Sequence, residues 1–268
     1  MRKKRTYVKA VSATACYFFV SQTLQASQAN AITSKVLRLA APDNWCPVAC
    51  SANSKKEGTY IDIARAIWPD WRLSYSNASY ARIIINAKKG LVDAIPAVIP
   101  NEAPGFLFPS TPGSVVQWCF YKKPGADWRF TGVDSLKGHQ IGITQGYSYP
   151  SEIEAVRNTE EGNASFLTLA GREVPRRLSK MVLANRLTAM VEGKEAMEWQ
   201  MSEKFLPRLA NAGCIKERVP AFLAFSPSFV KAKEMAKEFS EGMRRLRASG
   251  QLRQILLRYG LTDFEAKL

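Results

Sequence analysis

The sequence contains few of the side chains on which hydrolytic and metal-dependent enzymes rely. It has one histidine, His139, and no triad signature accompanies it. A general base needs an oriented partner, so we do not expect His139 to be catalytic. A Walker loop, a dinucleotide-binding glycine fingerprint and an H-E-x-x-H motif are also missing. We therefore expect a protein that is not an enzyme and has no cofactor.

Long apolar runs are missing as well, apart from a short one near the N-terminus. Five basic residues and no acid occur in Met1 to Lys9, a mostly apolar stretch follows from Ala10 to Leu24, and Ala29-Asn30-Ala31 is a cleavage motif. This layout is typical of a secretory signal peptide, here residues 1–31, because the apolar run is too short to span a bilayer. We expect export to the periplasm; a retained amphipathic anchor is the alternative.

Acidic residues are in the minority, with 23 against 38 basic ones and a net charge of +15. Without the five basic residues of the predicted signal peptide, 33 basic and 23 acidic residues leave a net charge of +10. Such an excess can attract nucleic acid or anionic ligands, or hold a protein near an anionic envelope surface. Export argues against nucleic acid. Since much of the charge lies beyond residue 228, we expect it mainly to form a solvated helix face.

Cysteine is scarce, and four cysteines follow the predicted signal peptide: Cys46, Cys50, Cys119 and Cys214. An even number in an oxidising compartment suggests disulfides, with three possible pairings. We prefer a local bridge between Cys46 and Cys50, which are close together in a predicted loop. Whether Cys119 and Cys214 pair stays open. These cysteines and one histidine offer too few ligands for zinc, so no metal is expected.

The first part of the chain alternates predicted strands and helices. The strands are expected at 36–41, 73–75 and 91–99, and the helices at 60–68 and 80–89. Their apolar spacing, with Pro69 and Gly90 as helix stops, supports these assignments. The resulting βαβαβ pattern predicts a mostly parallel sheet with helices on its faces, and such sheets bind ligands at the carboxyl ends of their strands.

The second part contains a second α/β unit. Strands are expected at 115–121, 141–143, 166–169, 187–191 and 221–225, and helices at 173–185, 194–205, 228–248 and 251–259. The extended segments 115–121 and 219–225 connect this unit to the first. We therefore expect an α/β protein with two lobes and a cleft between them. Lobe 1 would contain residues 32–117 and 223–268, and lobe 2 residues 118–222.

A glycine turn joins a strand to a helix within Val133 to Ala155. The run Ile141-Gly142-Ile143 leads to Gly146, and a helix is expected from about Ser151. Such a junction directs unpaired N–H groups and the positive end of a helix dipole at one point, which suits an anion such as a carboxylate. Tyr147, Ser148 and Tyr149 are candidate ligand contacts there; capping of the helix is the alternative role.

The order of several short motifs resembles a known family. The motifs are Gly58-Thr59-Tyr60-Ile61-Asp62-Ile63, Lys89-Gly90-Leu91-Val92-Asp93-Ala94, Ser135-Leu136-Lys137-Gly138 before Ile141-Gly142-Ile143, and Gly250-Gln251-Leu252-Arg253 before Tyr259-Gly260-Leu261. In this order they resemble the periplasmic solute-binding proteins of the polar amino-acid type (extracellular solute-binding proteins, family 3). The resemblance implies a type II two-lobed fold with two hinge crossings, each lobe being a mostly parallel sheet flanked by helices. It also implies a cleft that closes on a small solute, usually for a membrane permease. We expect the protein to be a monomer.

Two segments depart from the family pattern. Where the family usually has T-x-E-R, whose arginine holds a ligand carboxylate, this chain has Pro100-Asn101-Glu102-Ala103-Pro104. Where the second lobe usually has R-x-D-A, this chain has Arg186-Leu187-Thr188-Ala189. Ordinary α-amino-acid recognition is therefore in doubt. Arg82 is the substitute arginine we favour, although an ion pair would explain it equally well.

Other candidates follow from their places in the predicted lobes. Trp45 could stack on a ligand or belong to the core, and Asp43 could meet a ligand cation or cap a turn. Tyr80 faces the same loop region, and Glu192 lies near where the family holds a ligand amine, or is a solvated loop acid. We predict capture of a small amino-acid-like or organic-acid solute for an ABC-type transporter. An orphan sensory receptor acting through a membrane partner, and a dehydratase-type enzyme on this fold, are the alternatives.

Overall fold

The computed structural model describes residues 35–42 and 45–264. All of them belong to one compact unit, Ser34–Leu268. The predicted signal peptide and the candidate Asp43 lie outside the described residues. Within the described part, no helix is both long enough and apolar enough to cross a membrane.

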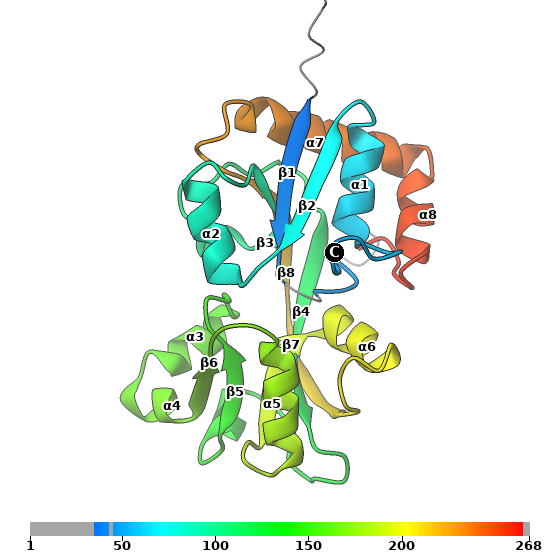
Figure 1. The fold of residues 1–268 in the computed structure, drawn as a ribbon. Helices are drawn as coiled ribbons and strands as arrows, with labels where there is room; N and C mark the ends of the chain where they lie inside the picture. The colour runs from blue at the N-terminus through cyan, green and yellow to red at the C-terminus, as the bar shows by residue number, and fades with distance from the viewer. Residues whose placement is uncertain (1–34, 43–44, 265–268) are drawn as a thin grey trace, which may run out of the picture. The chain divides into compact units, whose positions relative to one another are not determined.

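Within the described residues, eight strands form one sheet in the order β2-β1-β3-β8-β4-β7-β5-β6. Figure 1 shows the sheet with its flanking helices. Their bounds are β1 Val36–Ala41, β2 Arg72–Asn77, β3 Ala94–Val98, β4 Ser114–Lys122, β5 Ile141–Thr144, β6 Phe166–Leu169, β7 Ala189–Gly193 and β8 Ala210–Phe225. Strand β1 pairs in parallel with β2 and β3, and β5 pairs in parallel with β6 and β7. The antiparallel strands β4 and β8 join these two parallel groups. This arrangement confirms the predicted α/β class with two parallel groups and two crossings.

Helices follow most strands along the chain. They are α1 Thr59–Ile67, α2 Tyr80–Lys88, α3 Ser151–Arg157, α4 Glu160–Ala164, α5 Val174–Leu183, α6 Lys194–Ser202, α7 Ala232–Ala248 and α8 Gln251–Leu257, with short 3₁₀ helices η1 Pro100–Glu102 and η2 Val133–Leu136. We use lobe 1 for the part built on β1 to β3 with α1, α2, α7 and α8. Lobe 2 is the part built on β5 to β7 with α3 to α6.

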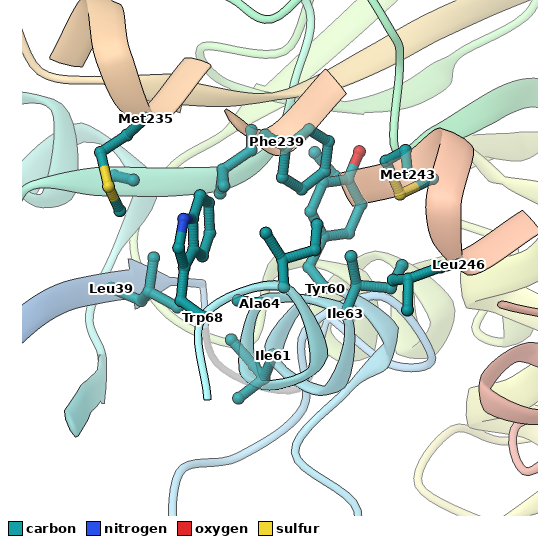
Figure 2. Close-up of a cluster of buried hydrophobic side chains, with 14 of the residues drawn as sticks. Leu39, Tyr60, Ile61, Ile63, Ala64, Trp68, Met235, Phe239, Met243 and Leu246 are labelled. Atoms are coloured by element: carbon teal, nitrogen blue, oxygen red, sulfur yellow. The ribbon is translucent and has the colours of Figure 1, made fainter. Parts of the chain in front are cut away.

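The core of lobe 1 combines the two ends of the described chain. In α1, the apolar spacing places Tyr60, Ile63 and Ala64 on a buried face. Figure 2 shows this face against Phe239 and Met243 of α7. The Tyr60 ring stacks on Phe239 with 6.4 Å between ring centroids. Helix α2 packs on the opposite face of the same strands, in a separate apolar cluster, so lobe 1 has a helix layer on each side.

The strand β8 is much longer than the sequence suggested. We expected a strand at 221–225 and an extended crossing from residue 219, but the strand begins at Ala210 and has 16 residues. Residues 210–221 pair with β4, and its last residues pair with β3. The predicted lobe boundaries, at residues 117/118 and 222/223, therefore lie within the two strands that both lobes share. Helix α4 was not expected either.

Two disulfides are present in the described part of the chain, and they use the four cysteines that follow the predicted signal peptide. Cys46 is bonded to Cys50, the pairing that the sequence favoured. Cys119 is bonded to Cys214, a pairing that the sequence left open. These two residues lie opposite one another in β4 and β8, so the second bridge cross-links the two strands that connect the lobes.

Candidate ligand-binding cleft

The carboxyl ends of the parallel strands point toward the junction of the two lobes. Trp45 lies in the loop after β1, Tyr80 begins α2 after β2, and Glu102 ends η1 after β3. From lobe 2, Tyr147 lies in the turn after β5, and Glu192 lies near the end of β7. Segments distant in the sequence thus meet at the edge where α/β sheets bind ligands.

Two cavities lie at this junction. The smaller, of about 220 Å³, is lined by Trp118 and Glu192 among others. The larger, of about 390 Å³, lies between the start of α2 and the segment that begins α5. Trp45, Glu102 and Tyr147 line both cavities, so the two cavities adjoin at these three residues.

The Tyr147 ring is the centre of an aromatic cluster. Its centroid lies 6.1 Å from that of Trp45, in a stacked arrangement with 29° between the planes. It lies 6.1 Å from Tyr80 and 5.8 Å from Trp118. Tyr149 packs beneath, 4.8 Å from Trp118, and its hydroxyl accepts a hydrogen bond from the Thr144 N–H. The first four rings border the cavities, whereas Tyr149 supports them from below.

Glu102 bridges the two lobes through its carboxylate. Oε2 accepts hydrogen bonds from the Tyr80 hydroxyl at 2.8 Å and from the Ile99 N–H at 3.1 Å. Oε1 accepts a hydrogen bond at 2.8 Å from the N–H of Ser148, in the turn after β5. Burial raises the pKa of Glu102, and these three hydrogen bonds oppose the rise. The Ser148 N–H, expected to meet a ligand anion, therefore meets this internal carboxylate.

Two buried polar atoms that line the smaller cavity have no partner among the described residues. They are the indole Nε1 of Trp118, a donor, and Oε2 of Glu192, an acceptor. The other oxygen of Glu192 accepts a hydrogen bond from the Gly193 N–H at 2.9 Å. Unpartnered buried polar atoms cost about 1–3 kcal/mol each, and native proteins rarely leave them so. A bound polar molecule could satisfy both.

Glu192 is not the solvated loop acid that the sequence allowed as the alternative. It lies within β7, and only 1% of the residue is exposed. Burial raises its pKa to about 7. A carboxyl group with such a pKa, placed in a cavity wall, is a candidate binding residue.

Carboxyl groups outnumber bases around the smaller cavity. The acids lining it are Glu102, Glu192, Glu195 and Glu198, and the bases are Lys194 and Arg218. Burial raises the pKa of Glu195, while Lys194 and Arg218 both lower it. The two bases therefore act electrostatically on Glu195.

The structure does not bring Arg82 into the cleft. Its side chain is exposed on α2, and Arg82 lines neither of these two cavities. His139 lies just before β5, at the opposite strand end from the cleft, with Nδ1 3.3 Å from the Thr188 hydroxyl. Among the described residues, no group of three or more His, Cys, Asp or Glu side chains could hold a metal ion.

Two residues of the cleft were missed from the sequence. In the sequence, Glu102 belongs to a segment distinguished only by its lack of arginine, although it is the first acid after the buried strand β3. Trp118 lies in the mostly apolar part of β4, where an indole is expected to pack in the core. The position of an acid just beyond the carboxyl end of a parallel strand could have indicated Glu102. No sequence signal distinguishes Trp118.

Comparisons with known proteins agree in fold. No family model and no curated protein matches the sequence. A histidine kinase sensor domain similar to periplasmic binding proteins aligns with 85% of this chain and 98% of its own, with a TM-score of 0.70 and 16% identity. An ancestral arginine-binding protein aligns with 84% of this chain and 97% of its own, with a TM-score of 0.68 and 16% identity. A protein of glutathione import through the cystine ABC importer of Streptococcus mutans aligns with 85% of this chain and 96% of its own. Its TM-score is 0.68 and its identity is 13%. At such identities the likeness is one of fold, and the chain has the two-lobed fold of the periplasmic binding proteins.

Proposed function

We propose that this protein is an extracytoplasmic solute-binding protein that captures a small polar solute between its lobes. The observation that carries the proposal is the pair of buried, unpartnered atoms, Trp118 Nε1 and Glu192 Oε2, in the wall of one cavity. A solute that donates to Oε2, with its own acceptor or a bridging water at Nε1, would satisfy both. Removal of residues 1–31 would release the protein, as a monomer, into the periplasm.

Binding would proceed by closure of the lobes. The solute first meets Trp45 and Tyr80 of lobe 1, and lobe 2 then brings Tyr147 and Glu192 against it, while the predicted contact Ser148 keeps its N–H on Glu102. Tyr149 supports this turn from below. The solute shifts the equilibrium toward the closed form only by its greater affinity for that form.

Delivery of the solute to an ABC-type permease is the role we favour. The likeness in fold to a protein of the Streptococcus mutans import system supports this role. A sensory role through a membrane partner is the second candidate, because a histidine kinase sensor domain has the same fold. We expect binding without turnover, since His139, the natural first choice for a general base, lies at the far end of lobe 2 from the cleft.

A thermal-shift screen tests solute binding. Protein purified from expression of the full chain is screened against amino acids, organic acids, polyamines and quaternary amines, with each hit followed by mass spectrometry. At a hundredfold excess over the dissociation constant, a ligand adds about 2.7 kcal/mol to the free energy of unfolding. We expect a saturable shift with the compound recovered intact. Consumption of the hit would favour an enzyme, and no shift with any compound would contradict the proposal.

Glu192→Gln tests the site. A hydrogen bond to a charged group contributes about 1.5–3 kcal/mol, and Glu192 is charged above its pKa of about 7. In titration calorimetry near pH 8 this isosteric change should therefore weaken binding about tenfold or more. Unchanged affinity would remove Glu192 from the site.

Arg82→Ala tests the arginine that the sequence suggested, and it serves as the control for Glu192→Gln. Its exposed position outside both cavities gives no route to the solute. We expect the dissociation constant to stay within about twofold, which is less than 0.5 kcal/mol. A tenfold loss would return Arg82 to the site and would require α2 to move on closure.

A further inference from the structure

The donors at the lobe junction that would bind a solute carboxylate are already engaged. The Ser148 N–H and the Tyr80 hydroxyl, from opposite lobes, both donate to Glu102, each at 2.8 Å. The Ile99 N–H donates to the same carboxylate. A solute carboxylate would have to displace Glu102 and would then lie beside its negative charge. The junction therefore disfavours a second carboxylate.

The remaining groups of the smaller cavity favour a positive charge. Three aromatic rings, those of Trp45, Trp118 and Tyr147, line it, and the faces of such rings attract cations. Glu192 presents an oxygen without a partner to the same space. The wall contains four acids against two bases, Lys194 and Arg218, and both bases lower the pKa of one of those acids, Glu195.

We propose that the cleft takes an organic cation without a carboxylate, either a protonated amine or a quaternary ammonium compound, and that Glu102 determines this choice by occupying the donors that a carboxylate needs. This inference rests on the proposed function and narrows it. It replaces the amino-acid-like or organic-acid solute predicted from the sequence, because the turn after β5 binds an internal anion, the Glu102 carboxylate.

Matched pairs of compounds that differ in a carboxylate test the inference. Titration calorimetry on protein from the full chain compares agmatine with arginine, cadaverine with lysine, and choline with glycine betaine. We expect at least one amine to bind, and to bind about tenfold or more tightly than its carboxylate-bearing counterpart. No amine binding at millimolar concentration would overturn the inference. An amino acid binding as tightly as its amine would also overturn it, while leaving solute binding intact.

Substitutions of Glu102 test its role in that preference. Glu102→Ala frees the Ser148 N–H and the Tyr80 hydroxyl, so the preference for the amine should fall about tenfold or reverse. Glu102→Gln keeps the size of the side chain, and should weaken amine binding without a comparable gain for the amino acid. The control is Glu152→Gln, an equal change of charge at an exposed position of α3, which should leave both affinities unchanged. An unaltered preference in both Glu102 variants would show that Glu102 does not set specificity.

Discussion

Replacing Cys119 and Cys214 together with alanine is expected to lower the free energy of unfolding by about 4–5 kcal/mol. The bridge spans a sequence separation of 95 residues, so it removes much of the conformational freedom of the unfolded chain. It also joins directly opposite residues of the two strands that both lobes share. Urea unfolding without reductant measures the loss.

The other disulfide provides a matched control for this prediction. Cys46 and Cys50 are separated by only 4 residues, and the same entropy relation gives about 2 kcal/mol for the Cys46→Ala, Cys50→Ala variant. The loss should therefore be at least about twice as large for the long bridge. Equal losses would show that the stabilisation does not come from the length of the closed loop.

The second large effect is a pH-dependent gain in stability on replacing Glu192 with glutamine. Burial raises the pKa of Glu192 from 4.5 to about 7, so the folded state binds this proton more tightly than the unfolded state does. The contribution of the protonated group is fully present below pH 4.5 and is lost as the pH rises through about 7. A rise of this size corresponds to about 3 kcal/mol.

Glutamine has nearly the same shape and does not titrate. The two proteins should therefore be about equally stable near pH 4, and Glu192→Gln should be about 3 kcal/mol more stable near pH 8. Urea unfolding of both proteins at several pH values measures the difference, in which the other titrating groups cancel. A difference that does not change with pH would contradict the assignment. Since the same variant should bind solute more weakly, Glu192 would be an example of stability given up for function.

Much of the fold could be predicted, because in many elements the local sequence pattern indicates the same secondary structure that the tertiary pairing requires. The alternation in β1, the apolar face of α1 and the buried run of β3 each indicate one type of element. The beginning of β8 could not be predicted, because residues 210–217 contain a glycine and little alternation. Pairing with β4 and the Cys119–Cys214 bridge hold these residues in a strand, and both contacts join residues far apart in the sequence. Helix α4 is short and includes Gly162, which gives no periodic signal.

The site was less predictable than the fold. Position after a strand was enough to select Trp45, Tyr80, Tyr147 and Glu192, which do line the cleft. The same logic could not show that Arg82 points to solvent, because a helix start does not fix which side chains face the neighbouring lobe. It also could not show which group occupies the anion-binding position predicted in the turn after β5. That answer required the distance from Glu102 to the Ser148 N–H, which joins residues of different lobes.

Lobe 1 is built from segments on both sides of the two crossing strands in the sequence. This division affects the order in which the two lobes can be completed as the chain emerges. Domains generally fold from the N-terminus as the chain emerges. The apolar face of α1 is covered by Phe239 and Met243 of α7, which are synthesised long after α1. Lobe 2 lies between the crossings in the sequence, and all of its parallel strands, β5 to β7, precede α7. Lobe 1 therefore begins first and is finished last, so a nascent chain that stops before α7 leaves the face of α1 without its covering layer.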